Sequence, residues 1–353
     1  MKIRENVLIS GLTTMRLGGA ARFVLEVESK DDVVEAFRFA EERGLPVWMM
    51  GGGANTLGHD EGFPGVVILN RLRGIEIVRE ENGEMVLRGM GGEIWDDFVK
   101  FACERGYSGI EAMSIIPGTL GAAPVQNIGA YGQDIAQVIE SVEAFDTQTG
   151  EFVTLGKDEM NMSYRHTRFN TSEDAGRFFI VAVTVKLKEG ELEPPFYSSL
   201  QRYIDEHGET DFSPKNIRKM VSEIRSEKLP NPEKVASAGS FFKNVYVDKA
   251  GADAAEAQGI PLWRNEDGSG KINSGWLVEA CGLKGKVMRG IRVSDKAALV
   301  LINESAESYA DLAAAREEIV GAVAEKFGLV LEQEPVEMVA PPERQSTKME
   351  EKK

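Results

Sequence analysis

The sequence predicts an α+β protein divided into two blocks, roughly residues 1–190 and 196–340. The chain has 353 residues, which is more than one hydrophobic core usually spans, so more than one domain is expected. Strand-like and helix-like segments alternate within each block. The stretch EGELEPP at 189–195 has the composition of a linker, which places the boundary between the blocks.

The first block begins with a strand, because apolar and polar residues alternate in RFVLEVE at 22–28. An amphipathic helix follows at 31–43, and Gly44 is a typical helix stop. A second helix is expected at 93–105, where apolar residues recur on one face. Short apolar runs predict further strands at 46–50, 65–70, 84–90, 141–146, 151–155 and 178–188.

The second block begins with a helix at 213–226, with Pro214 in the first turn, where proline fits best. A strand is expected at 298–303. The apolar stripe of 305–327 then predicts a long helix that ends before Gly328. The charged, proline-initiated tail at 341–353 is expected to be disordered.

Composition and charge exclude several classes of function. The formal net charge of −16 disfavours binding to nucleic acid. No apolar run reaches the ~18 residues that a membrane span needs, and the N-terminal stretch lacks an apolar signal segment. Cys103 and Cys281 lie far apart and form no CxxC pair, which argues against a disulfide scaffold or a thiolate metal site. We therefore expect a cytoplasmic protein without a membrane partner or a metal.

Common nucleotide and catalytic motifs are absent from the sequence. GGGANTLG at 51–58 follows a strand, but Thr56 takes the last glycine position of GxGxxG and no helical pattern follows, which disfavours a Rossmann site. Gly270-Lys271 lacks the upstream glycine and the following Ser or Thr of a P-loop. The histidines are too scattered for a zinc helix or an obvious Ser-His-Asp set, at His59, His166 and His207.

The segment AGSFFKN at 238–244 raises the question of what a serine does there. Ser240 and Lys243 formally match the SxxK pair of β-lactam-binding acyl enzymes. The SDN and KTG elements that accompany this pair do not occur in the chain, so a chance match is favoured. Phe241 and Phe242 are expected to pack in the core and fix the strand.

Two glycine-rich elements are candidates for ligand binding. Gly51, Gly52 and Gly53 follow a short apolar strand and allow backbone amides to approach an anion; a tight strand-to-loop connection is the alternative. IPGTLGAAPVQNIGAYGQDI at 116–135 carries almost no charge, so it is expected to be buried against a flat, large group. Its alternative is a compact crossing between strands.

GGGAN, IPGTLGAAPVQNIGAYG, SYR at 163–165 and AGSFFKN resemble, in order and spacing, the family of UDP-N-acetylenolpyruvoylglucosamine reductases. The match extends over residues 10–340, and other members of the same flavin-binding fold lack GSFFKN. The resemblance implies a vanillyl-alcohol-oxidase (PCMH) type FAD-binding domain at 1–190, with lobes at about 1–72 and 73–190. It also implies an α+β substrate-binding domain at 196–340.

The resemblance further implies that the two glycine-rich elements bind FAD noncovalently. The first element would hold the diphosphate through backbone amides, and the second would line the flavin. The residues implied are Gly51, Gly52, Gly53, Ala54, Asn55, Thr56, Pro117, Gly118, Thr119, Gly121, Ala122, Gln126, Asn127, Gly129 and Ile180.

The activity implied is the NADPH-dependent reduction of UDP-N-acetylglucosamine enolpyruvate to UDP-N-acetylmuramate, in peptidoglycan precursor synthesis. Arg165 of SYR matches the family residue that stabilises the enolate formed by hydride transfer. Ser240 matches the proton donor, since an enolate is basic enough to take a serine proton. Glu334, in Leu331-Glu332-Gln333-Glu334, matches a family glutamate, although Pro335-Val336-Glu337 departs from the Val-Arg of some members.

Substrate binding is assigned by the same resemblance. Arg225 and Lys228 lie three residues apart and would bind the substrate diphosphate; a solvated helix face is the alternative. Lys243 and Asn244 would also contact substrate. Tyr197 resembles the tyrosine loop of one subclass, which closes over bound substrate; an exposed linker aromatic is the alternative.

A monomer that takes a UDP-sugar is expected, with NADPH as co-substrate. Three other functions remain as alternatives: a related flavin oxidase with another substrate, a serine acyl enzyme using Ser240 and Lys243, and a noncatalytic nucleotide-binding regulator.

Overall fold

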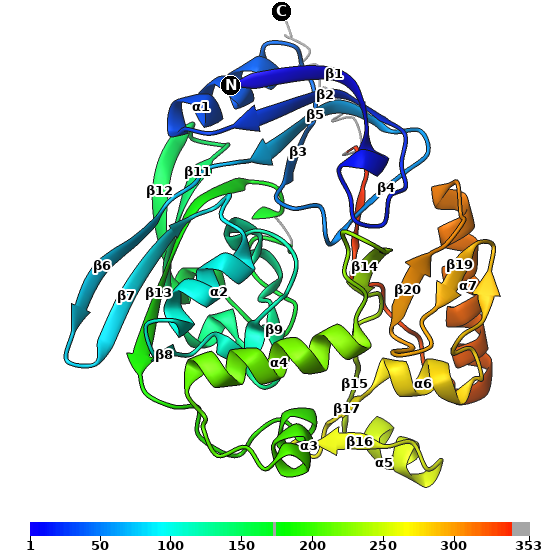
Figure 1. The fold of residues 1–353 in the computed structure, drawn as a ribbon. Helices are drawn as coiled ribbons and strands as arrows, with labels where there is room; N and C mark the ends of the chain where they lie inside the picture. The colour runs from blue at the N-terminus through cyan, green and yellow to red at the C-terminus, as the bar shows by residue number, and fades with distance from the viewer. Residues whose placement is uncertain (172–173, 341–353) are drawn as a thin grey trace, which may run out of the picture.

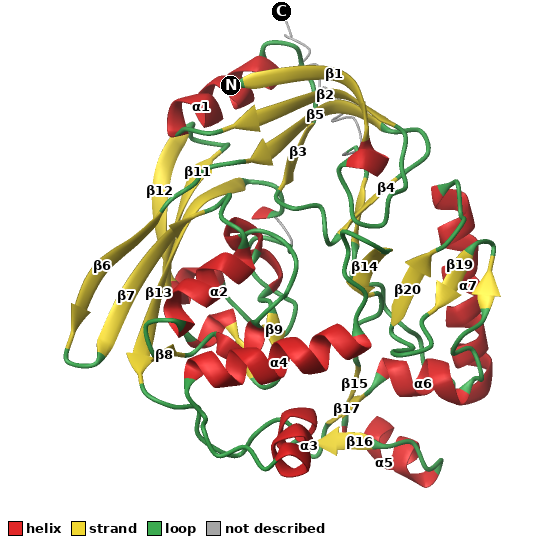
Figure 2. Cartoon of the chain, in the orientation of Figure 1, coloured by secondary structure: helices red, strands yellow, loops and turns green. Residues whose placement is uncertain are grey.

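A computed structural model of the chain describes residues 1–171 and 174–340 (Figure 1). The tail at 341–353, for which the sequence predicts disorder, lies outside the described residues. Helices and strands are mixed throughout, as Figure 2 shows, which confirms the predicted α+β class. Among the described residues, none of the helices combines the length and apolarity of a membrane span.

The first lobe is a four-stranded sheet with the order β1-β2-β5-β3. The β1–β2 pair is antiparallel, whereas β2 and β3 both run parallel to β5. The helix α1 begins after Ser29, whose side chain accepts from the backbone N–H of Asp32 at 3.1 Å and forms a capping box. The elements are β1 (Lys2–Leu8), β2 (Ala20–Val27), α1 (Lys30–Glu41), β3 (Val47–Met50), β4 (Thr56–Gly58) and β5 (Phe63–Asn70).

The second lobe is a six-stranded antiparallel sheet with the order β12-β11-β13-β7-β6, and β8 pairs with the end of β13. Phe98 and Val99 of α2 pack on Leu87 and Val183 of this sheet. The elements are β6 (Ile75–Glu81), β7 (Glu84–Met90), α2 (Trp95–Cys103), β8 (Tyr107–Ser108), β9 (Gly129–Ala130), β10 (Gln133–Asp134), β11 (Ile139–Asp146), β12 (Glu151–Gly156) and β13 (Phe178–Glu189).

The two lobes share a hydrophobic core, so their relative position is fixed by packing. Phe145, Phe179 and Val181 of the second sheet pack with Val33 and Ala36 of α1. All five side chains are at most 4% exposed. Removing this much apolar surface from water favours one arrangement of the lobes.

The helices α3 (Ser198–His207) and α4 (Pro214–Lys228) follow the segment predicted as a linker. They bury a small core of their own, which includes Leu200 and Ile217. Arg218 of α4 binds Asp96 of α2 through two hydrogen bonds of 2.6 and 2.7 Å, so α4 lies against the second lobe (Figure 1). The domain boundary at 190–196 stays a prediction.

The C-terminal region packs a four-stranded antiparallel sheet, β14-β20-β19-β18, against α6 and α7. A three-stranded sheet, β15-β17-β16, lies beside α5. The elements are β14 (Ala236–Ser240), β15 (Val245–Val247), α5 (Lys249–Ala257), β16 (Leu262–Arg264), β17 (Gly270–Ile272), α6 (Ser274–Ala280), β18 (Val287–Met288), β19 (Ile291–Val293), β20 (Val300–Asn303) and α7 (Tyr309–Phe327).

The last strand returns from the C-terminal region to the first lobe. The strand β21 (Val336–Met338) pairs in parallel with β4, and Val336 N donates to Asn55 O at 2.9 Å. In Figure 1 this red segment runs between the two parts of the molecule. The strand β21 therefore lies directly beside the first glycine loop.

Candidate active site

The first glycine loop lies against the second glycine-rich segment. A Cβ on Gly51 would meet Thr119 Oγ1 at 2.1 Å, and one on Gly52 would meet Gly118 Cα at 3.0 Å. Gly53 has φ +65°, a conformation that side chains disfavour, and its Cβ would meet the backbone. Gly51 and Gly52 are therefore required by the close approach of the second segment, and Gly53 by its backbone conformation and its contact with Leu12.

Thr119 carries an unpaired polar atom at this contact. Its side chain is 6% exposed, and Oγ1 makes no hydrogen bond within the described residues. A buried hydroxyl without a partner is costly, and a ligand that enters the cradle can supply one. The residues present thus fit the expected FAD: glycines that leave room, and a buried hydroxyl that is unpaired within the described residues.

The second segment is a series of short 3-10 turns at Leu120–Ala122 and Pro124–Gln126. A Cβ on Gly121 would lie 3.0 Å from Ile180 O, so this glycine lets the turn pack on β13. The loop is buried only in part: Thr119, Gly121 and Asn127 are buried, whereas Pro117 and Ala122 are exposed. Gln126 Nε2 reaches Glu334 O at 3.4 Å, and Asn127 Nδ2 donates to Ser163 O at 3.0 Å.

Arg165 is the centre of the site. It has φ 53°, and its guanidinium is held at three points. Nε donates to Glu334 Oε1 at 2.7 Å, Nη1 donates to Asn127 O at 2.9 Å, and Nη2 donates to Gly129 O at 3.3 Å. The guanidinium is thus fixed between the second glycine-rich segment and the C-terminal segment, as a preorganised positive charge must be.

Glu334 is held through its main chain as well. Its N–H donates to Phe241 O at 2.9 Å, and its carbonyl oxygen accepts from Asn55 Nδ2 at 3.5 Å and from Gln126 Nε2 at 3.4 Å. The structure therefore brings together residues from the first lobe, the second lobe and the C-terminal region, and all of them were predicted from sequence.

Ser240 lies at the end of β14, next to Phe241. The pairing of β14 with β20 shifts between Ser237 and Ser240, and Gly239 at this bulge has φ +72°. A bulge re-aims a side chain, and Ser240 is exposed, whereas Phe241 and Phe242 are at most 1% exposed. The packing role predicted for the two phenylalanines is confirmed.

A pocket of about 610 Å³ opens beside Arg165. Lys243 and Asn244 contribute to its wall, together with Tyr164 and Tyr246. Lys243 Nζ is paired with the exposed Glu332. Asn244 Oδ1 accepts from Ser274 N at 3.2 Å, which orients this amide. A volume of this size suits a small ligand.

The predicted diphosphate residues differ in their surroundings. Arg225 is partly buried on α4, Nε has no hydrogen-bond partner in the described part of the chain, and burial lowers the pKa of the guanidinium. Lys228 is exposed one turn further along. The Tyr197 ring packs edge-on against Tyr131, 5.6 Å between centroids.

Sequence reasoning missed several residues at the site. Tyr131 belongs to the quoted motif NIGAYG but was not assigned a role, and its side chain lies beside Arg225. Tyr164 and Tyr246 have ring centroids 5.0 Å apart. Burial and, second, the charge of Arg165 lower the pKa of Lys271. Lys271 lies opposite exposed aromatic residues in a strand ladder, and only the fold reveals this arrangement.

Comparisons with known proteins agree with this arrangement. A family model described as FAD binding domain matches residues 21–156, which lie in both lobes. A second model, described as UDP-N-acetylenolpyruvoylglucosamine reductase, C-terminal domain, matches residues 231–338. The matches confirm the predicted FAD-binding fold with a C-terminal domain.

Whole-chain relatives carry the same name. The chain is 37% identical over 329 residues to UDP-N-acetylenolpyruvoylglucosamine reductase of Ralstonia nicotianae, covering 92% of this chain and 95% of that protein. It is 36% identical to the Neisseria gonorrhoeae enzyme of that name, covering 94% and 96%. The crystal structure of the Thermus caldophilus reductase, at 24% identity, covers 96% of this chain and 99% of that one with a TM-score of 0.64, which shows a shared fold. This chain belongs to the UDP-N-acetylenolpyruvoylglucosamine reductase family.

Proposed function

We propose that the protein reduces UDP-N-acetylglucosamine enolpyruvate to UDP-N-acetylmuramate, with FAD as cofactor and NADPH as co-substrate. Membership of the family and the FAD-binding domain support this activity. The observation that carries it in the structure is the Arg165–Glu334 pair, held between the flavin loop and the strand end that bears Ser240.

The substrate contains a double bond conjugated to a carboxylate. FAD, held by the two glycine-rich segments, would supply the hydride-transfer chemistry between NADPH and the outer carbon of this double bond. Arg165 binds the substrate carboxylate and stabilises the negative charge that grows on it. Glu334 keeps the guanidinium in place through the 2.7 Å hydrogen bond.

The inner carbon then takes a proton from the Ser240 hydroxyl. The C–H bond forms as the serine O–H bond breaks, and the alkoxide regains its proton from solvent. Because Ser240 is exposed in the structure without substrate, solvent can reach it for this last step. Overall, one hydride from NADPH and one proton from water saturate the double bond.

Substrate binding uses the positive charges near the pocket. We assign Arg225 and Lys228 to the substrate diphosphate, and Arg225 is suited to it because its Nε lacks a hydrogen-bond partner among the residues that the structure describes. Lys243 and Asn244 line the pocket beside Arg165. Tyr197 would close over the bound sugar nucleotide from its position at the start of α3.

The remaining assignments are proposals of the same kind. We propose a cytoplasmic monomer, and a division into a FAD-binding domain at 1–190 and a substrate-binding domain at 196–340. With this division, α4 belongs in sequence to the substrate-binding domain, but it packs on the second lobe of the FAD-binding domain.

Stopped-flow absorbance of the flavin tests the proposed function. NADPH should bleach the bound flavin, and the enolpyruvyl sugar nucleotide should restore its colour. Flavin that NADPH never bleaches would instead indicate a noncatalytic regulator. A colourless protein that a β-lactam labels would indicate a serine acyl enzyme and overturn the proposal.

A further inference from the structure

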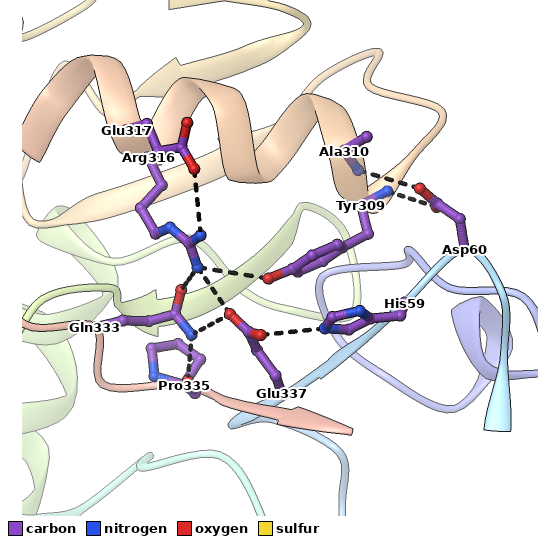
Figure 3. A network of polar contacts seen from close by, with 9 residues as sticks. All are labelled: His59, Asp60, Tyr309, Ala310, Arg316, Glu317, Gln333, Pro335 and Glu337. Carbon is purple, nitrogen blue, oxygen red and sulfur yellow. Dashed lines mark hydrogen bonds and ion pairs between the residues drawn. The ribbon is translucent and has the colours of Figure 1, made fainter. Parts of the chain in front are cut away.

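A cluster of polar side chains joins three separate parts of the chain beside the segment that carries Glu334 (Figure 3). His59 follows β4 in the first lobe, and Arg316 lies on α7. Gln333 and Glu337 flank Glu334 in the sequence. Glu337 also belongs to Pro335-Val336-Glu337, the stretch that departs from the Val-Arg of some family members.

Arg316 binds both flanking residues with one nitrogen. Nη1 donates to Gln333 Oε1 at 2.7 Å and to Glu337 Oε1 at 2.7 Å. Gln333 Nε2 in turn donates to Pro335 O at 2.8 Å and to Glu337 Oε1 at 3.3 Å. One guanidinium therefore holds the chain on both sides of Glu334.

The same cluster is anchored to the first lobe. His59 Nε2 lies 3.1 Å from Glu337 Oε2, and its ring stacks on Tyr309 with centroids 3.9 Å apart. Asp60 accepts from the first amides of α7, Tyr309 N at 2.6 Å and Ala310 N at 3.1 Å. An acidic side chain at a helix start is favourable, so α7 is fixed to the loop that follows β4.

Glu337 is charged within this cluster. Burial acts to raise its pKa, but hydrogen bonds from Tyr309, Arg316, Gln333 and His59 outweigh burial and hold the pKa below its ordinary range. The side chains of Arg316 and Glu337 are 23% and 29% exposed. Truncating one member of such a pair leaves the other charge partly buried and unpaired.

We propose that Arg316 is a positioning residue that acts through Gln333 and Glu337 to fix the segment carrying Glu334, and thereby aims the guanidinium of Arg165. The inference rests on the proposed function. The main-chain bonds of Glu334 and Val336 fix where this segment runs. The Arg316 contacts fix it from the side of α7, so both faces of the segment are held.

The test compares two variants of Arg316. Arg316→Gln removes the positive charge that binds Gln333 and Glu337, whereas Arg316→Lys keeps a positive charge. Glu318→Gln is the matched control. Glu318 lies on the same helix as Arg316, and the change breaks only an exposed 3.5 Å pair with Arg289. Each holoenzyme is assayed by stopped flow for flavin reduction by NADPH and for reoxidation by the enolpyruvyl sugar nucleotide.

Arg316→Gln should slow reoxidation about tenfold, since a misplacement of 1 Å or less in a catalytic group costs one to two orders of magnitude. Reduction by NADPH should change less than about twofold, and Arg316→Lys should lie between wild type and Arg316→Gln. In a Glu334→Gln background, Arg316→Gln should add no further loss, because the effect passes through Glu334.

Reoxidation at the wild-type rate in Arg316→Gln would overturn the inference, as would a full additional loss in the Glu334→Gln background. Equal loss in both half-reactions would indicate a general structural role and would overturn it too.

Hydrogen exchange gives a readout without turnover. The amides of residues 333, 334 and 336–338 should exchange faster in Arg316→Gln and in Glu337→Gln than in the control; equal exchange contradicts the inference. Failure of the wild type in either half-reaction would instead refute the proposed function.

Discussion

Replacing Thr119 by valine removes a buried hydroxyl that has no hydrogen-bond partner within the described residues. An unpaired buried polar group costs about 1–3 kcal/mol, so Thr119→Val should raise the unfolding free energy of the FAD-free protein by about 1 kcal/mol. If FAD supplies the missing partner, the same change should weaken FAD binding. The loss of one hydrogen bond, about 1.4 kcal/mol, corresponds to a roughly tenfold higher Kd.

Urea unfolding of the FAD-free protein, followed by tryptophan fluorescence, measures the first effect, and titration of flavin fluorescence measures the second. Thr167→Val is the matched control. Its Oγ1 is buried, donates to Val125 O at 2.7 Å and accepts from Phe169 N at 3.1 Å. This variant should lose about 1–3 kcal/mol, because it leaves two groups unpaired.

The two variants should therefore move the urea midpoint in opposite directions. If Thr119→Val unfolds at as low a urea concentration as Thr167→Val, the Thr119 hydroxyl of the wild-type protein must be paired without FAD. Unchanged FAD affinity would show that the hydroxyl does not face the cofactor. Either result would refute the reasoning.

Three further predictions concern the remaining site residues. Ser240→Ala should leave flavin reduction by NADPH intact and slow reoxidation by at least about a hundredfold, as measured by stopped flow; equal survival of both steps would reject the acid role. Arg225→Ala and Lys228→Ala should raise KM for the sugar nucleotide about tenfold with little change in kcat; a pure loss of kcat would place them in the chemistry. Burial acts to raise the pKa of Asp96, but hydrogen bonds from Arg218 and a main-chain amide lower it overall. Because the folded pKa of Asp96 is depressed, the Asp96–Arg218 pair stabilises the protein fully above the unfolded pKa of 3.8. This stabilisation is lost as the pH falls through the folded pKa. Asp96→Asn should thus lose about 2 kcal/mol of unfolding free energy near pH 7 and converge with wild type as the pH falls below the depressed folded pKa of Asp96; a constant difference would contradict the pairing.

Sequence periodicity located most of the elements that it predicted, but it missed the strands of two or three residues and several longer elements, such as β1, β6 and α5. The helix predicted at 31–43 is α1 (Lys30–Glu41), and the one at 213–226 is α4 (Pro214–Lys228). The strand at 84–90 is β7 without any change of bounds. The predicted helix at 305–327 begins later, because Ser308 caps α7 at Tyr309.

Elements that depend on tertiary contacts were not predicted. The strand β4 has three residues and exists because β21 pairs with it, 280 residues later in the chain, from Thr56 to Val336. The helix α3 was read only as the tyrosine loop, since its apolar face packs on α4 rather than on a sheet. Strands this short carry too few residues to show a period.

The candidate site shows the same division. Motif resemblance selected Arg165 and Glu334, which the structure joins at 2.7 Å. No pattern linked Asp96 to Arg218, because their partnership depends on how α4 crosses α2. Arg316 was equally hidden, since residues 333–337 meet α7 only after the chain has turned back.

The position of β21 also limits when a nascent chain becomes functional. Residues 51–58 and 116–135 leave the ribosome well before Glu334 and the strand that pairs with β4 are made. A product that stops at residue 330 retains every other predicted catalytic and binding residue but lacks the carboxylate that steadies Arg165. Synthesis must therefore pass residue 334 before the Arg165 guanidinium can be held as it is in the folded protein, so chains that stop short of this point lack the complete site.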